Sequence, residues 1–162
     1  MATAFDTFNQ YAFGQYPGHL EDRGMADVVS RLASGSDIGY GIGVADSDYR
    51  VAGIVGAADT PTGITLRESV RDNAAGDNPA AVYPEDTEMS VVRVGRVWVA
   101  VEEGDTPASG DAVYVIPETG VLTSAEDSGG GDPTAYVLFP NAAFKTGPNE
   151  NGLCLVQLNG SD

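Results

Sequence analysis

The run of residues 90–101 constrains the fold of this chain more than any other feature. It reads Ser-Val-Val-Arg-Val-Gly-Arg-Val-Trp-Val-Ala-Val, and valine is the most β-favouring of its residues. Its valines fall on both faces of an extended chain, so we expect a strand that is covered on both sides or that curls through a barrel wall. Gly95, in the middle of the run, predicts a bulge or a bend.

Short apolar runs separated by turn residues predict that the rest of the chain is also all-β. The chain holds 21 glycines and nine prolines, residues that commonly end short strands and form the turns between them. Residues 117–120, Pro-Glu-Thr-Gly, predict a tight hairpin turn. The further expected strands are 38–45, 50–55, 63–67, 112–116, 121–123, 135–139 and 153–158. Strands this short and evenly spaced predict a β-barrel or a sandwich.

Three segments are less determined by the sequence. Residues 25–33 fit either two helical turns or a strand, because the run is short and β-branched. Residues 73–86 and 126–132 are expected to be flexible acidic loops.

An aromatic N-terminal segment differs from everything that follows it. Five rings fall within twelve positions, and they belong to Phe5, Phe8, Tyr11, Phe13 and Tyr16. So many rings are poorly accommodated in water. We therefore divide the chain into an N-terminal arm, residues 1–24, and a β-barrel or sandwich domain, residues 25–162. The arm either docks on its own barrel or buries its rings against a neighbouring molecule.

The net charge of −16 excludes several classes of partner. With 24 acidic residues against eight basic ones, the surface repels nucleic-acid phosphates and anionic lipids. Adaptation to a salty environment is an alternative reason for the acidity. No apolar stretch approaches the ~18 residues of a membrane span, and the N-terminus has no basic or apolar signal region. We expect a soluble, intracellular product.

Residues suited to catalysis or to metal binding are scarce. His19 is the one histidine, in a segment rich in glycine and proline, and no activated serine or cysteine motif accompanies it. Asp46 with Asp48, and Asp127 with Asp132, lack the spacing of a calcium loop and are expected to be solvated turn residues. Cys154 lies in an apolar run and is expected to be a buried hydrophobe. We predict no enzyme activity, no cofactor and no metal site.

Four arginines are the remaining candidates for a functional surface. Arg67 and Arg71 flank one short segment, and Arg93 and Arg96 interrupt the valine strand. Arg93 and Arg96 have opposite parity, so they point to opposite faces of a regular strand unless Gly95 forms a bulge. Each is either exposed on its own domain or an anchor in an interface, where arginine suits forked, desolvated contacts.

The order of motifs resembles the structural cement, or decoration, proteins of tailed-bacteriophage heads. The motifs that carry the resemblance are residues 14–18 (GQYPG), 24–31 (GMADVVSR), 39–44 (GYGIGV), 63–68 (GITLRE), 94–99 (VGRVWV), 110–115 (GDAVYV), 141–144 (NAAF) and 152–156 (GLCLV). No single motif is specific, whereas their ordered set spans most of the chain. Met25 stands where the family pattern has proline, and the acidic loops are individual to this chain.

The resemblance implies a small antiparallel β-barrel or tulip-like sandwich with an extended N-terminal arm. It also implies a homotrimer or homodimer on the outer surface of a capsid, made in the host cytoplasm, that bridges and stabilises major capsid protein subunits. The five aromatic residues of the arm and the four arginines are then the expected contacts with the capsid or between copies. Two other classes remain open: a phage tail or baseplate β module or a host-surface (carbohydrate) adhesion protein, and a small hydrolase.

Overall fold

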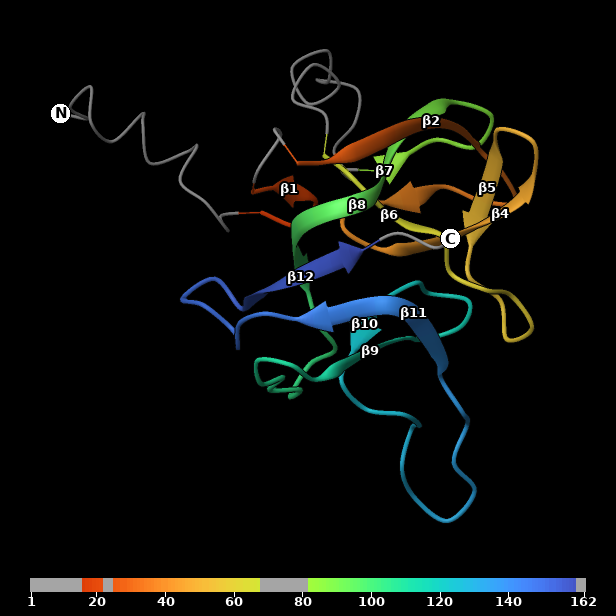
Figure 1. Cartoon of the computed structure of the whole chain (residues 1–162). Coiled ribbons are helices and arrows are strands. Elements are labelled where there is room, and N and C mark those ends of the chain that lie inside the picture. The colour runs from red at the N-terminus through yellow and green to blue at the C-terminus, as the bar shows by residue number, and fades with distance from the viewer. Residues whose placement is uncertain (1–15, 22–24, 68–81, 160–162) are drawn as a thin grey trace, which may run out of the picture.

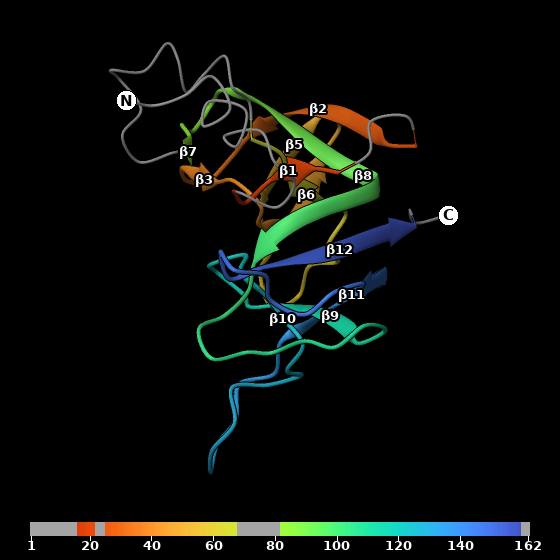
Figure 2. The same ribbon diagram turned by 90° about the vertical axis from the view of Figure 1, so that its left-hand side faces the viewer.

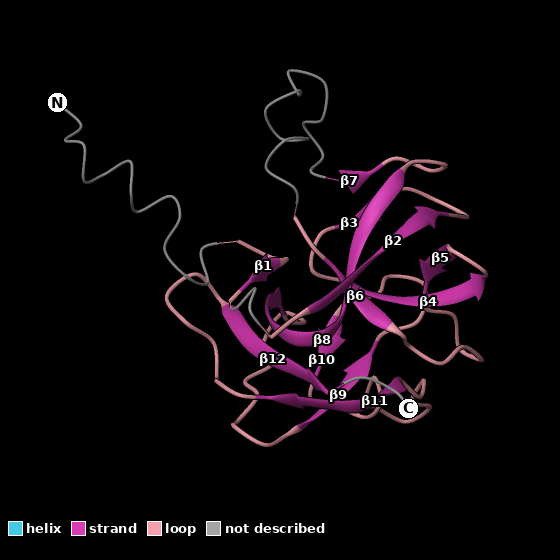
Figure 3. Cartoon of the chain, turned by 45° about the horizontal axis from the view of Figure 1, so that its top comes forward, coloured by secondary structure: helices cyan, strands magenta, loops and turns pink. Residues whose placement is uncertain are grey.

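The computed structural model describes residues 16–21, 25–67 and 82–159, and this part of the chain is all-β, with no helix (Figures 1 and 3). The strands, in chain order, are β1 (His19–Leu20), β2 (Asp27–Ala33), β3 (Ile38–Gly39), β4 (Gly43–Asp48), β5 (Val51–Ile54), β6 (Gly63–Thr65), β7 (Val82–Tyr83), β8 (Glu88–Ala100), β9 (Ala112–Val115), β10 (Leu122–Thr123), β11 (Val137–Phe144) and β12 (Leu153–Asn159). The expected all-β class and the small barrel are confirmed.

Five strands close a small barrel. Their order is β8-β2-β5-β4-β6, and β6 pairs again with β8 to complete the ring. Every pairing in the ring is antiparallel except that of β2 with β5. The β2–β5 pairing is also short, because it joins only Leu32 to Val51 and Ala33 to Ala52.

A second group of strands extends from the same long strand. The order β10-β9-β11-β12-β8 is antiparallel throughout, so β8 belongs to both the barrel and this second sheet. Figures 1 and 2 show the barrel at one end of the molecule and the second sheet at the other, with β8 running between them.

A bulge in β8, two residues before the predicted position at Gly95, explains how one strand contributes to two cores. Val91 is buried inside the barrel, whereas Val92 and Val97 are buried in the core between the barrel wall and the second sheet. Val92 and Val97 differ in parity but face the same core, so one extra residue lies between them. The register with β2 shifts between Val92 and Val94, so Arg93 is the extra residue, and Gly95, which pairs regularly with Leu158 of β12, has a positive φ of 135° two residues later.

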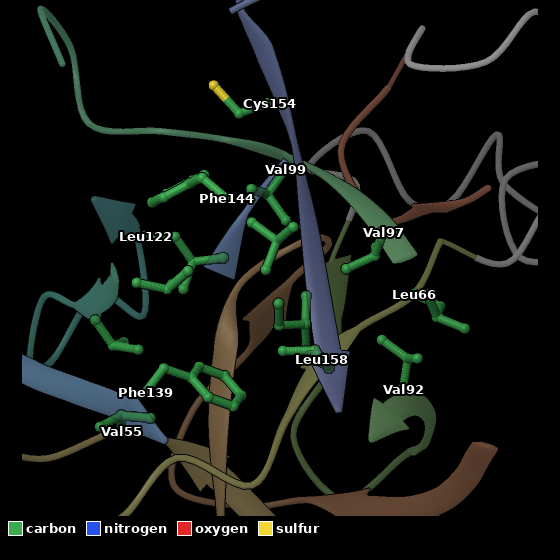
Figure 4. Packing of buried hydrophobic residues seen from close by; sticks show 14 of the residues in the cluster. Val55, Leu66, Val92, Val97, Val99, Leu122, Phe139, Phe144, Cys154 and Leu158 are labelled. Carbon is green, nitrogen blue, oxygen red and sulfur yellow. The ribbon is translucent and has the colours of Figure 1, made fainter. Parts of the chain in front are cut away.

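The larger core lies between the two groups of strands (Figure 4). Val99, Phe144 and Leu158 come from three different strands and are almost completely buried. The barrel core is smaller, and the two-stranded pairing of β3 with β7 adds to it. Tyr83 is fully buried there, meets Tyr40 edge-to-face at 5.1 Å and donates a hydrogen bond to the Leu66 carbonyl.

The structure corrects several expected boundaries. The expected strand 38–45 is divided, because Gly41 turns the chain at a φ of 69° between β3 and β4. Residues 25–33 contain a strand and not helical turns. Residues 82–83, which we expected to be part of a flexible loop, form β7. Strand β11 begins at Val137 and runs on to Phe144, beyond the expected end at residue 139.

Two predicted turn regions lie in the second sheet. The turn at residues 117–120 joins β9 to β10, with Gly120 at a φ of 72°, so the predicted hairpin is confirmed. Residues 126–132, expected to be a loop, lie in a hydrogen-bonded projection in which Tyr136 N donates to the Glu126 carbonyl at 2.9 Å. Figures 1 and 2 show this projection, between β10 and β11, extending away from the barrel.

Candidate functional site

The structure describes four of the nine residues that the sequence nominated for contacts. These are Tyr16, Arg67, Arg93 and Arg96. The other five, Phe5, Phe8, Tyr11, Phe13 and Arg71, lie outside the described residues. Tyr16, Arg67 and Arg96 all lie around β1, which pairs with the second half of β8 through His19 opposite Trp98 and Leu20 opposite Val97.

Gly18 fixes the chain that leads into β1. Its N–H donates to the Trp98 carbonyl at 2.8 Å, and its own carbonyl accepts from Arg67 N at 3.0 Å. Its φ is 79°, and a Cβ built there would lie 2.7 Å from Arg67 N. A side chain at position 18 would therefore strain the backbone and overlap the Arg67 N–H. Residues 16 and 67, far apart in sequence, are held side by side as a result.

A three-layer stack joins these two segments. The Tyr16 and His19 rings are stacked, with centroids 4.7 Å apart and an interplanar angle of 14°. The Arg67 guanidinium carbon lies 4.6 Å from the centroid of the Tyr16 ring. This is within the range of a cation–π interaction. Arg67 and Tyr16, both nominated from the sequence as contact residues, thus contact each other.

Arg93 and Arg96 lie in different parts of β8, one in its bulge and the other in the regular part that follows. Val97 faces the larger core, and the alternation of side chains turns its neighbour Arg96 away from that core, whereas Arg93 is the extra residue of the bulge and is partly buried. The sequence placed the bulge at Gly95, whereas the register shift falls at Arg93 and Gly95 pairs regularly with Leu158 of β12. The Arg96 side chain is 53% exposed, and its Nη1 lies 3.9 Å from a carboxylate oxygen of Glu21, a weak ion pair.

Two buried polar atoms lie beside these arginines. Trp98 Nε1 and Glu21 Oε2 have almost no exposed surface and make no hydrogen bond, within the part of the chain that the structure describes. Buried polar groups usually have a partner. The β1–β8 contact is therefore a place where further polar contacts would stabilise the molecule.

Charge is distributed unevenly along the chain. Residues 1–100 carry fourteen acidic residues and all seven arginines, whereas residues 101–162 carry ten acidic residues and a single lysine. The described residues of the first part form the barrel strands, β1, β3 and β7, and those of the second part form the remaining strands of the second sheet with its projection. The five arginines that the structure describes lie on the barrel strands, next to them or on β8, away from the acidic projection: Arg31, Arg50, Arg67, Arg93 and Arg96.

One ion pair in the barrel was not anticipated from the sequence. Arg31 on β2 makes a forked contact with Asp46 on β4, with Nε–Oδ1 at 2.8 Å and Nη2–Oδ2 at 3.1 Å. The hydrogen bond to Asp46 raises the pKa of Arg31, against the opposing effect of partial burial. Asp46 is a structural partner of an arginine and not simply a solvated turn residue.

The described residues offer little for catalysis. No group of three or more His, Cys, Asp or Glu side chains within them is placed to hold a metal ion. Nor do they include a helix that is long and apolar enough to cross a membrane.

Cys154 is fully buried, as expected. Burial, followed by the charge of Asp105, raises the pKa of its thiol to about 11.

The comparison with known proteins agrees with the motif order. Residues 6–159 match the family described as "Structural cement protein (E217 gp24/Pam3 gp6)". The chain belongs to this family of structural cement proteins. A solved structure entitled "The capsid of Myoviridae Phage XM1" contains a chain of the same fold, with a TM-score of 0.67 and 22% identity over 89% of each chain. No curated protein matches the sequence.

Proposed function

We propose that this cement protein binds the outside of a bacteriophage capsid and bridges neighbouring major capsid protein subunits. Its membership of the structural cement family is the observation that carries the proposal. A protein that binds the assembled shell and not its free subunits stabilises the shell by mass action. Many copies on one particle multiply a modest individual affinity. Such a role needs no catalytic residue.

The surface around β1 and the bulge of β8 is the proposed contact with the capsid. Arg96 is exposed there, Arg93 lies in the bulge of β8, and Tyr16, the last aromatic residue of the proposed arm, lies beside β1. The five aromatic residues of the arm and Arg71 belong to the same proposal. Arginine pairs well with carboxylates, so the partner surface would be acidic or rich in backbone carbonyls.

The acidic second sheet would then face away from the shell. Its projection, at residues 124–136, carries three acidic residues, Glu126, Asp127 and Asp132, and no basic one. An outward acidic surface keeps decorated particles soluble and apart. Nucleic acid and anionic membranes are not partners in this proposal, because the net charge of −16 repels both.

Heads depleted of the protein provide the test. They should burst at a lower temperature, or on osmotic shock, and adding the protein back should restore them. Arg96→Ala should weaken binding to depleted heads by about 2 kcal/mol or more if the arginine is desolvated in the complex. It should change the melting temperature of the free protein very little, since a weak exposed pair contributes less than about 1 kcal/mol.

Lys145→Ala is the matched control, because it removes a positive charge from the acidic half of the molecule. It should leave binding to heads unchanged. If depleted heads are as robust as decorated ones, the cement role is wrong for this chain. Binding to tails in place of heads would favour a tail module.

A further inference from the structure

The loop between β11 and β12 contains an asparagine followed by a glycine, Asn151 and Gly152 (Figure 1). Both residues are exposed, and Gly152 has a positive φ of 73°. A Cβ built on Gly152 would meet no atom within 4 Å, so packing does not explain the glycine. The missing side chain has a chemical consequence, because nothing on the glycine shields its backbone nitrogen from the amide of the preceding asparagine.

An asparagine amide in this position can lose ammonia without a co-reactant. The backbone nitrogen of Gly152, once deprotonated, attacks Cγ of the Asn151 side chain. A new C–N bond forms, the bond from Cγ to the amide nitrogen breaks, and the proton lost from Gly152 leaves with the ammonia. The product is a cyclic imide. Water then opens the ring at either carbonyl, which gives aspartate or isoaspartate and restores the Gly152 N–H.

The native turn at residues 149–153, the Asn149 turn, opposes the first step of this reaction. The Gly152 N–H donates a hydrogen bond to the Asn149 carbonyl at 2.9 Å. The nitrogen must lose this proton before it attacks, so the hydrogen bond must break first. The imide nitrogen carries no hydrogen, so the ring is also incompatible with that bond. Ring closure therefore requires local opening of the turn.

Asn149 holds the turn closed through its side chain and its backbone. Its Oδ1 accepts from Asn151 N at 2.9 Å and from Leu153 N at 3.0 Å. Its backbone N–H donates to the Leu153 carbonyl at 2.9 Å. Leu153 is buried and begins β12, so these bonds attach the turn to the packed part of the second sheet. Loss of the Asn149 side chain would remove two of the bonds that keep the turn closed.

We propose that Asn151 is a site of spontaneous deamidation whose rate is set by the opening of the Asn149 turn. The folded protein reacts slowly, and the unfolded chain reacts fast. The product adds one negative charge to a chain that already carries −16. Isoaspartate also lengthens the main chain by one carbon atom, which displaces Asn149 and Leu153 from their pairing. The inference does not rest on the proposed function, because the reaction needs only this chain and water.

The first experiment compares folded wild-type protein with the same protein in guanidinium. Both samples are incubated at pH 8 in water enriched in heavy oxygen, so that ring opening labels the new acid. Fragmentation in the mass spectrometer of the peptide that follows Lys145 separates Asn151 from Asn159, which also precedes a glycine. We expect Asn151 to convert at least about tenfold more slowly in the folded protein.

Asn149→Ala tests the role of the turn. It removes the acceptor for Asn151 N and Leu153 N, so the folded variant should deamidate about fivefold to thirtyfold faster than the folded wild type. In guanidinium the two proteins should react at the same rate, because neither has the turn. Asn149→Asp retains an acceptor oxygen and should keep the slow rate. Glu150→Gln changes an exposed side chain of the same turn, and this matched control should also keep it.

The isoaspartate product tests the effect on β12. Ion-exchange chromatography separates the deamidated protein from the unreacted protein by charge. Its isoaspartate form should melt at a lower temperature than Asn151→Asp, which has the same charge and a main chain of normal length. Equal melting temperatures would contradict the displacement of Asn149 and Leu153.

Three results would overturn the inference as a whole. One is an Asn151 that reacts as fast in the folded wild type as in guanidinium. Another is an Asn151 that keeps its amide in guanidinium. The third is a folded Asn149→Ala variant that reacts at the rate of the folded wild type. The first two results need no variant, so they decide the matter even if Asn149→Ala does not fold.

Discussion

Gly18 and Gly41 lie backbone against backbone, and a Cβ on Gly41 would come within 2.7 Å of Gly18 N. Both residues have positive φ, 79° and 69°. Gly41 makes the turn between β3 and β4, and Gly18 precedes β1. The two turns therefore fit together only because neither residue has a side chain.

Gly41→Ala should destabilise the fold by about 2–4 kcal/mol, from a left-handed alanine and from overlap with the Gly18 backbone. The melting temperature, followed by circular dichroism, measures this effect. Gly18→Ala should have a similar cost, because its Cβ would meet Arg67 N.

Gly35→Ala is the matched control for this prediction. Gly35 also has a positive φ, 86°, but a Cβ there would meet no atom within 4 Å. Gly35→Ala should lower the free energy of unfolding only by the strain of a left-handed alanine, about 1–2 kcal/mol. Equal losses for Gly35→Ala and Gly41→Ala would show that the close contact of the two turns is unimportant.

The sequence predicts the long strand well and the short ones poorly. The valine run identifies β8, because a strand buried on two sides needs apolar residues at consecutive positions, whereas its bulge lies at Arg93, two residues before the predicted Gly95. By contrast, β1 and β7 have two residues each, and they exist because of partners distant in sequence. No local pattern signals such pairings, since tertiary contacts and not propensity create them.

The sequence predicts some residues of the candidate site but not the contacts between them, because tertiary structure creates those contacts. The residue types nominate Arg67 and Tyr16 separately, as a cation and an aromatic ring. Their contact depends on Gly18 bonding to both Trp98 and Arg67, which the spacing of the residues does not reveal. The Arg31–Asp46 ion pair cannot be predicted from the sequence either, because β2 and β4 come together only when the barrel forms.

The Tyr16–Arg67 contact should contribute to the stability of the free protein. A double-mutant cycle with Tyr16→Ala and Arg67→Ala should give a coupling free energy of about 0.5–2 kcal/mol, as expected for a cation–π pair. Denaturant unfolding measures it. Arg67→Ala thus differs from Arg96→Ala, which should leave stability nearly unchanged. A coupling of zero would mean that the ring and the guanidinium do not interact.

Asp105 should make the second sheet sensitive to acid. Burial raises the pKa of its carboxyl, but hydrogen bonds from the hydroxyl and N–H of Ser124 and the hydroxyl of Thr123 outweigh this and lower it overall. A lowered pKa in the folded state stabilises the protein above the ordinary pKa of aspartate, and this contribution is lost as the pH falls below it.

Asp105→Asn should therefore reduce the free energy of unfolding at pH 7 by about 1–3 kcal/mol, the cost of weakening charge-assisted hydrogen bonds. It should also flatten the acid limb of a plot of melting temperature against pH. Asp132→Asn, in the exposed projection, is the control and should change neither quantity. An acid limb that is the same in Asp105→Asn and the wild type would contradict the prediction.

Cys154 should be inert in the folded protein. Its side chain is fully buried, and the pKa of its thiol is raised from 9.0 to about 11. Because the thiolate is the reactive form, a disulfide reagent at pH 8 should label native protein far more slowly than protein unfolded in guanidinium. The raised pKa also predicts a loss of stability in alkali. Below pH 9 the thiol is neutral in both states, and from pH 9 towards 11 the unfolded state gains from ionisation.

An engineered, exposed cysteine tests whether burial is the cause of the low reactivity of Cys154. Ser47→Cys places a thiol on an exposed position of β4, and it should react at pH 8 at the rate of a free thiol while Cys154 in the same molecule does not. Cys154→Ala should remove the part of the alkaline loss of stability that comes from the thiol. Rapid labelling of Cys154 in the native protein, with the melting temperature unchanged, would mean that the core around β12 opens readily, in contrast to its complete burial between β8 and β11.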